Sequence, residues 1–337
     1  MHRVRTALPD CRHRRPARGW RWPALALAML VAACAAPTPS VDRVAPVAGA
    51  PQPAGLVWDV ARGEAIAPAT LVDRLADADI AVLGDRAGNP AHHIRQAWLV
   101  AALDPVGVAV GAVPQGSENG IAVFRAEGGA PGDIGPAIGW ARLGVPDWVL
   151  YRPIFEAAAN AAITGGRQPR AVLARAMRDG AAAAYGPGAA QVGLTQQLPP
   201  GERAARDADI GAALCEGLPA DQVASMIEAL RFRDARLADA ALRARAKGID
   251  RDLLAGATRP ARAVLIAGNS NARRDRGVPA YLASLAPGLR VATLGQIEVR
   301  AGALAPEAYP DVALYDYVWF SAPFLGPAAR CGQTQPG

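Results

Sequence analysis

The chain has 337 residues, of which 51% are apolar and 20% charged, and its formal net charge is +6. This composition is close to that of an ordinary soluble globular protein and excludes intrinsic disorder and collagen-like architecture for the body of the chain. Residues 1–33 hold seven arginines and one aspartate, so the remainder of the chain is neutral. The part of the chain after residue 33 has no net positive charge that would attract nucleic acid, so no nucleic-acid partner is expected.

Residues 1–33 have the layout of a secretory signal, with an Arg-rich start, an apolar run over 23–33 and small residues up to Cys34. The apolar run is about half of the roughly 20 residues that a membrane-spanning helix needs. Val31-Ala32-Ala33-Cys34 resembles the bacterial lipobox, which implies a diacylated Cys34 as the new N-terminus. A plain signal peptide cut nearby is the alternative. Ala35, in place of Asp, favours anchoring to the outer membrane, facing the periplasm.

Cys34 and the segment up to residue 55 form the expected tether, which is rich in Pro, Ala and Gly and has no periodicity. The folded domain is expected over 56–331, and 332–337 is a tail. Cys215 and Cys331 remain as an even pair in an exported chain, which predicts a disulfide between them. Two unpaired buried thiols are the alternative.

Within the folded domain, short apolar runs predict strands and segments of helical periodicity predict helices. The expected strands are 80–84, 106–113, 261–267, 290–294 and 315–321. The expected helices are 71–77, 90–103, 153–164, 170–178, 219–247 and 279–285, and 133–217 is expected to be a mostly helical insertion. Strands that alternate with helices predict an α/β fold, with a mostly parallel sheet flanked by helices.

Two loops follow predicted strands, at residues 84–90 and 268–274. Because ligands bind at the carboxyl ends of the strands in parallel sheets, these loops are the first candidates for a site. Neither loop contains a phosphate-binding glycine motif, and no serine lies in a nucleophile elbow.

Three segments carry a family resemblance. They are LGDRAGNPAHH (83–93, followed by Gln96), GVPDWVLYRPIF (144–155) and AGNSNARRDRGVP (267–279). In this order they resemble the ChaN-type haem-binding lipoproteins of the wider Tiki/TraB and erythromycin-esterase-like superfamily, over about residues 55–331. The resemblance implies haem, or a similar flat hydrophobic anion, as the ligand and a role in haem or iron uptake or storage. It also implies a homodimer that encloses the ligand and an outer-membrane haem receptor system as partner.

The chain departs from the family pattern at several polar positions. Asp85 stands in place of a Glu, and Ala87, Leu214 and Asn271 stand in place of His. Downstream of Cys34 the only histidines are His92 and His93, which diverge by about 100° on a helix and so rarely bind one ion. No metal site and no catalytic residue are therefore expected. A scaffold lipoprotein that does not bind haem is the alternative function, and a metal-dependent hydrolase is the third.

Tyr151 is the position that matches tyrosine ligation of haem, as the resemblance implies. Arg152 beside it is expected to lower the pKa of the phenol or to pair with a propionate. A packing aromatic at a helix start is the alternative for Tyr151. His92 and His93 fall in the first turn after Pro90, where they either bond loop carbonyls or contact a ligand carboxylate.

Further pocket candidates come from the motifs themselves. They are Asp85, Asn89, Gln96, Asp234, Asn269, Asn271, Arg273 and Arg274. Asp234 lies on the apolar stripe of the 219–247 helix, so its carboxylate needs a partner, expected to be Arg273 or Arg274. Asn269 and Asn271 are expected to hold their loop by side-chain hydrogen bonds to the backbone.

Overall fold

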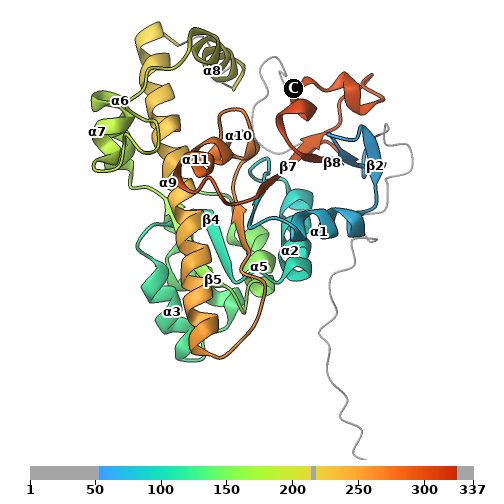
Figure 1. Ribbon diagram of the computed structural model, residues 1–337, viewed down its shortest axis with the longest axis vertical. Coiled ribbons are helices and arrows are strands. Elements are labelled where there is room, and N and C mark those ends of the chain that lie inside the picture. Colours follow the sequence, from blue (N-terminus) through green and yellow to red (C-terminus); the bar gives the residue numbers. More distant parts are fainter. Residues whose placement is uncertain (1–52, 214–217, 325–337) are drawn as a thin grey trace, which may run out of the picture. The chain divides into compact units, whose positions relative to one another are not determined.

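The computed structural model of the chain describes residues 53–213 and 218–324 (Figure 1). The expected signal, Cys34, most of its tether and both cysteines of the expected disulfide, Cys215 and Cys331, lie outside these residues. Within the described residues, no helix is both long and apolar enough to cross a membrane.

The described residues form an eight-stranded sheet in the order β2-β1-β8-β7-β3-β6-β4-β5. The strands are β1 (Val57–Asp59), β2 (Glu64–Ile66), β3 (Ile80–Leu83), β4 (Gly107–Pro114), β5 (Ala162–Arg167), β6 (Ala263–Ile266), β7 (Val291–Glu298) and β8 (Tyr317–Ser321). From β5 to β8 every pair is parallel, whereas β1 pairs antiparallel with β2 and β8. The prediction of a mostly parallel sheet is confirmed.

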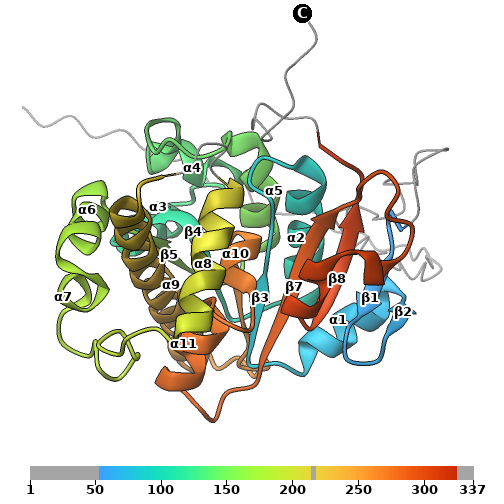
Figure 2. The same cartoon turned by 90° about the horizontal axis from the view of Figure 1, so that it is seen from above.

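Helices cover both faces of the sheet (Figures 1 and 2). They are α1 (Pro68–Ala76), α2 (Pro90–Leu103), α3 (Glu118–Ala126), α4 (Ile134–Ala137), α5 (Trp148–Ala157), α6 (Arg170–Asp179), α7 (Ala181–Tyr185), α8 (Pro200–Ala213), α9 (Ala220–Leu254), α10 (Asn269–Ala272) and α11 (Val278–Leu285). Short 3-10 turns span Pro131–Asp133, Trp140–Arg142, Pro306–Ala308 and Pro310–Leu314.

Successive side chains of a strand point to opposite faces of the sheet, so the sheet separates two hydrophobic cores. Ile80 and Val82 of β3 face one core, which they share with α6, α7, α9 and α11. Ala81 and Leu83 of the same strand face the other core, with α1, α2 and α5. A strand whose successive side chains are all buried reads as a continuous apolar run, which is why β3 and β6 are predictable from sequence.

The expected helix over 153–164 is wrong in its second half. The helix α5 begins at Trp148, where the Asp147 side chain accepts the Val149 N–H at 3.1 Å, and it ends at Ala157. Ala162–Arg167 is instead the edge strand β5, paired in parallel with β4. The segment 133–217, expected to be mostly helical, therefore contributes a strand to the sheet.

The glycines of β5 allow close packing. A Cβ at Gly165 would lie 2.2 Å from the Pro114 carbonyl oxygen, and one at Gly166 would lie 2.4 Å from Leu237 of α9. These residues lower the strand propensity of the segment but let it fit between β4 and α9.

Candidate functional site

A cavity of about 670 Å³ opens at the carboxyl ends of the parallel strands. Residues that follow β3 and β6, and the last residues of β5 and β7, line its polar side. Its apolar wall consists of Ala112, Val145, Leu173, Leu237, Ile266 and Ile297. Ligand pockets in proteins span roughly 300–1,000 Å³ and combine an apolar wall with a few polar groups, so this cavity has the size and character of a small-molecule site.

Tyr151 contributes a phenol to the cavity wall. It lies on α5, is 6% exposed, and its ring packs 4.5 Å from the His93 ring and 4.8 Å from the Trp140 ring, centroid to centroid. No hydrogen bond joins its hydroxyl to another described residue. Burial raises the pKa of Tyr151, and the neighbouring Asp85 raises it further, so the phenol is neutral at pH 7.

Arg152, the next residue on α5, points away from the cavity. Its Nε donates to Glu156 Oε1 at 2.8 Å, and 56% of its side chain is exposed. Successive helical residues diverge by about 100°, so the two neighbours face different surroundings. The expectation that Arg152 lowers the pKa of Tyr151 is not met, because the pKa of that phenol is raised.

Asp85 follows β3 and presents a buried carboxyl to the cavity. Gln96 Nε2 donates to Asp85 Oδ2 at 3.1 Å and to the Leu83 carbonyl at 3.0 Å, which orients the carboxyl from α2. Burial raises the pKa of Asp85 to about 7, and the hydrogen bond from Gln96 offsets part of that increase. Gln96 does not itself line the cavity.

The two histidines of α2 also lie outside the cavity lining. His92 Nδ1 accepts the Arg86 N–H at 2.9 Å, and its Nε2 lies 2.8 Å from Ser321 Oγ. Neither ring nitrogen of His93 has a hydrogen-bond partner in favourable geometry among the described residues. Burial lowers the pKa of His92 to about 3 and that of His93 to about 4, so both rings are neutral at pH 7.

The loop at 84–90 is tied to the end of β7. Asn89 caps α2 by accepting the Ala91 N–H at 3.0 Å, and its Nδ2 donates to Glu298 Oε1 at 2.8 Å. The Arg86 guanidinium forms an ion pair with the same Glu298 carboxylate. Asn89 thus caps α2 and links the 84–90 loop to the end of β7, and it does not line the cavity.

The loop at 268–274 is held by its asparagines, as expected for Asn269. Asn269 Nδ2 donates to the Gln296 carbonyl at 2.7 Å, and its Oδ1 accepts the Gln296 N–H at 3.0 Å. Asn271 Nδ2 instead donates to Asp234 Oδ1 at 2.5 Å. Both asparagines line the cavity. Burial raises the pKa of Asp234 to about 6, which Asn271 and the nearby Arg233 partly offset.

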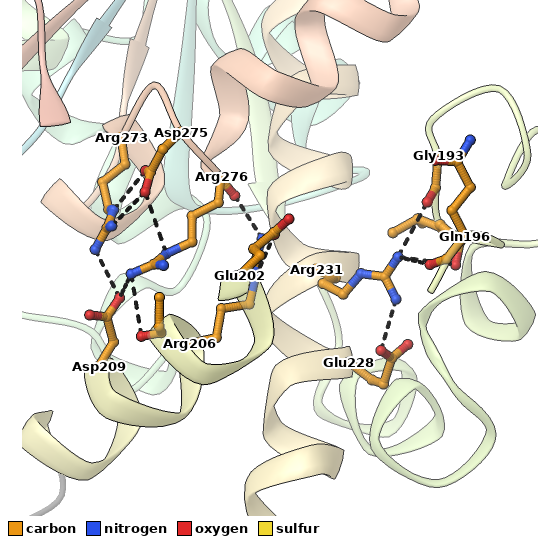
Figure 3. Close-up of polar contacts among 12 residues, drawn as sticks. Gly193, Gln196, Glu202, Arg206, Asp209, Glu228, Arg231, Arg273, Asp275 and Arg276 are labelled. Carbon is orange, nitrogen blue, oxygen red and sulfur yellow. Dashed lines mark hydrogen bonds and ion pairs between the residues drawn. The ribbon is translucent and has the colours of Figure 1, made fainter. Parts of the chain in front are cut away.

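The predicted ion pair between Asp234 and Arg273 or Arg274 is wrong. Arg273 pairs with Asp209 of α8 at 2.8 Å and with Asp275 at 2.7 Å (Figure 3). Arg274 pairs with Asp316 at 3.0 Å. Arginine reaches exposed acids more readily than a buried one, because desolvating two charges opposes the pair.

Several cavity residues escaped sequence analysis. They are Arg86, Arg167, Arg233, Gln296, Glu298, Asp311 and Tyr315. Arg86 lies inside the first motif and Arg233 is next to Asp234, so both could have been proposed as cavity residues from their neighbours in the sequence. Arg167 ends β5, the strand that was expected to be helix. Among the described residues, no group of three or more His, Cys, Asp or Glu side chains lies in a position to hold a metal ion.

Comparisons with known proteins place the chain in a family. A family model described as haem-binding uptake, Tiki superfamily, ChaN matches residues 71–282, which is more than half of the chain. The chain is similar to the structure of ChaN of Campylobacter jejuni with cofacial haem (15% identity, TM-score 0.56), covering 78% of this chain and 95% of that one.

A second solved structure, of the type III effector HopBA1, aligns at 14% identity and a TM-score of 0.39, covering 76% of this chain and 93% of that one. No curated protein matches the chain. The family match extends from α1 to α11, and it includes all three sequence motifs and most of the cavity wall. The chain therefore belongs to the ChaN family of haem-binding uptake proteins in the Tiki superfamily.

Proposed function

We propose that this protein binds haem in the cavity beside Tyr151 and serves haem uptake or storage. The observation that carries the proposal is a phenol without a hydrogen-bond partner, among the described residues, at the wall of a largely apolar cavity of about 670 Å³. Family membership supports haem as the ligand class.

The residues present fit the group that the proposal invokes. Haem requires an apolar surface for its ring, a ligand for its iron and cations for its carboxylates. Leu173, Leu237 and Ile266 supply part of the apolar surface, and arginines lie along the polar side. When bound, ferric iron would supply the Lewis acidity that favours a tyrosinate, a known axial ligand. Because burial keeps Tyr151 protonated in the free protein, binding through it would release a proton.

The cellular setting is also part of the proposal. Residues 1–33 and the lipobox-like sequence before Cys34 support lipid anchoring to the outer membrane, facing the periplasm. The tether up to residue 55 would allow a reach of roughly 60 Å at ~3.1 Å per residue. An outer-membrane receptor system is the proposed source of haem, and a homodimer that encloses the ligand is the proposed assembly.

Titration of the purified protein with ferric haem tests the proposed ligand. We expect a saturable change of the Soret band, with weaker binding and an altered spectrum in Tyr151→Phe. Tyr185→Phe is the matched control, because the Tyr185 hydroxyl bonds to Asp239 at 2.9 Å and does not line the cavity. A haem spectrum that micromolar protein leaves unchanged would contradict the proposal and would favour the scaffold alternative.

A further inference from the structure

The cationic side chains of the cavity differ in their partners. Three arginines line it: Arg86, Arg167 and Arg233. The Glu298 carboxylate neutralises Arg86. Neither Arg167 nor Arg233 has a carboxylate within ion-pair distance among the described residues. Two of the three cationic groups on the wall are therefore uncompensated by a direct ion pair.

Arg167 is held in place by one bond that leaves its charge unpaired. It is the last residue of β5, it is partly buried, and its Nη2 donates to the Leu143 carbonyl at 2.6 Å. A backbone carbonyl orients the guanidinium without neutralising it. The remaining donors of its planar fork stay available to a ligand.

Arg233 stands apart from the other arginines of its helix. The described part of α9 carries six arginines, and five of them donate to protein acceptors: Arg231, Arg236, Arg243, Arg245 and Arg251. Arg231, for example, reaches the carbonyls of Gly193 and Gln196 (Figure 3). Arg233 makes no hydrogen bond to a described residue, and its Nε is buried without a partner.

The acids near Arg233 are engaged elsewhere. Asp234 accepts from Asn271, and the influence of Arg233 on it is a through-space lowering of its pKa. Asp85 accepts from Gln96, and Glu298 pairs with Arg86. Of the acids on the cavity wall, Asp311 alone remains, and it is exposed to solvent. A partly buried guanidinium whose N–H groups lack acceptors destabilises the fold, and an anion that accepts from those N–H groups removes this penalty.

We propose that Arg167 and Arg233 form a two-point anchor for a ligand that carries two carboxylates. This inference rests on the proposed function and refines it, since it assigns the ligand class as a porphyrin dicarboxylate. Each guanidinium takes one carboxylate by charge-assisted hydrogen bonds. The anchor acts independently of iron, so a metal-free porphyrin diacid also binds.

Metal-free protoporphyrin and its dimethyl ester separate the carboxylate contribution from iron ligation. Fluorescence titration of the wild-type protein with both compounds, in matched detergent, should give at least tenfold weaker binding of the diester. Arg167→Gln and Arg233→Gln should each weaken binding of the diacid by about tenfold and leave binding of the diester unchanged. Arg233→Lys should restore part of the affinity for the diacid.

Arg175→Gln is the control variant, because Arg175 forms an exposed pair with Asp179 on α6 and does not line the cavity. Equal binding of diacid and diester would overturn the anchor, even if haem itself binds. An equal loss for both compounds in the arginine variants would also overturn it, by assigning those residues to packing. Failure of haem and both porphyrins to bind would overturn the proposed function together with the anchor.

Arg233 also borders a smaller cavity of about 220 Å³ between α8 and α9, with Met226, Leu230 and Asp234. If Arg233 served only that cavity, Arg233→Gln would bind the diacid as tightly as the wild type does. That result would remove Arg233 from the anchor and contradict the two-point arrangement.

Discussion

Asp85 and Tyr151 are two ionisable groups on one cavity wall, and burial favours the protonated form of both. Burial raises the pKa of Asp85 to about 7 and raises the pKa of Tyr151 well above its ordinary value. Charge on either group would disfavour charge on the other, because each lies within electrostatic reach of its neighbour. Below pH 7 the free cavity therefore presents two mostly protonated acids beside Arg167 and Arg233.

The buried carboxyl of Asp85 makes stability depend on pH. The native chain retains a proton on Asp85 between about pH 4 and pH 7, whereas the unfolded chain has released it. The stabilising contribution of that proton is therefore complete below pH 4 and disappears as pH rises through 7. Asp85→Asn cannot ionise, and its amide oxygen can still accept from Gln96.

We expect Asp85→Asn to stabilise the protein by roughly 2–4 kcal/mol at pH 8 and to change stability little at pH 4. Urea unfolding of wild type and variant at pH 4, 6 and 8 measures this difference. A difference between the two proteins that is the same at all three pH values would show that folding does not raise the pKa of Asp85.

Two adjacent histidines on α2 provide a test of buried polar groups. Both ring nitrogens of His92 form hydrogen bonds, one with the Arg86 N–H and one with Ser321 Oγ. Neither ring nitrogen of His93 has a partner in favourable geometry among the described residues. His92→Leu should cost about 2–4 kcal/mol because it leaves two buried groups unpaired. His93→Leu removes no hydrogen bond of favourable geometry and should cost less than about 1 kcal/mol. Equal costs in chemical denaturation at pH 7 would show that the two rings do not differ in bonding.

At the scale of elements, α9 lies against the sheet with backbone contact at glycines. A Cβ at Gly248 would lie 2.2 Å from the Val106 carbonyl oxygen, and one at Gly107 would lie 2.0 Å from the Ala244 carbonyl oxygen. This approach positions Leu237 and Arg233, two turns and more along the same helix, at the cavity. The long helix thus connects core packing to the site.

Gly248→Ala should destabilise the fold by about 1–3 kcal/mol through overpacking, although alanine is the better helix former by about 1 kcal/mol. Gly120→Ala on α3 is the matched substitution, because nothing lies within 4 Å of a Cβ at that position. It should stabilise the protein by up to about 1 kcal/mol. Denaturant midpoints of both variants measure the effects, and a stabilising Gly248→Ala would contradict the close contact.

Sequence patterns predicted the elements whose burial is visible in their own residues. The continuous apolar runs of β3 and β6 were assigned correctly. The amphipathic stretch of α9 was also recognised, but the predicted helix ended at 247 and α9 continues to Leu254. The strand β5 was missed because two of its six residues are glycines and its stability comes from β4 and α9. The intrinsic strand propensity of a segment does not include the stabilisation that comes from its contacts with other elements.

The same limit applies to the site. The motifs identified Asp85, Tyr151 and both loop asparagines, which do line the cavity. They did not reveal that Arg152 points away or that Arg233 lacks a bonding partner among the described residues. The ion-pair partner of each charged side chain depends on distances in the folded structure. Those distances cannot be read from a single sequence.

At the scale of the whole molecule, the excess positive charge belongs to residues 1–33, and the rest of the chain is neutral. The expected export signal and the proposed ligand site therefore lie in different parts of the sequence. A disulfide between Cys215 and Cys331 stays a prediction, as does lipidation at Cys34. Both concern parts of the chain outside the described residues.

Lipidation predicts a specific difference between two cysteine variants in a bacterial host. The wild-type chain should fractionate with membranes and have a mature mass that begins at a diacylated Cys34. Cys34→Ser should abolish both, whereas Cys11→Ser should change neither, because Cys11 lies in the expected signal and would be removed with it. A membrane-associated Cys34→Ser chain without lipid would contradict this anchor.

The position of iron in crystals of the haem complex tests the central proposal most directly. Anomalous scattering at the iron edge locates the metal without reference to the protein chain. We expect one iron peak inside the 670 Å³ cavity, adjacent to the Tyr151 hydroxyl. An iron peak outside the cavity, or one inside it that Tyr151 does not contact, would contradict the proposed site.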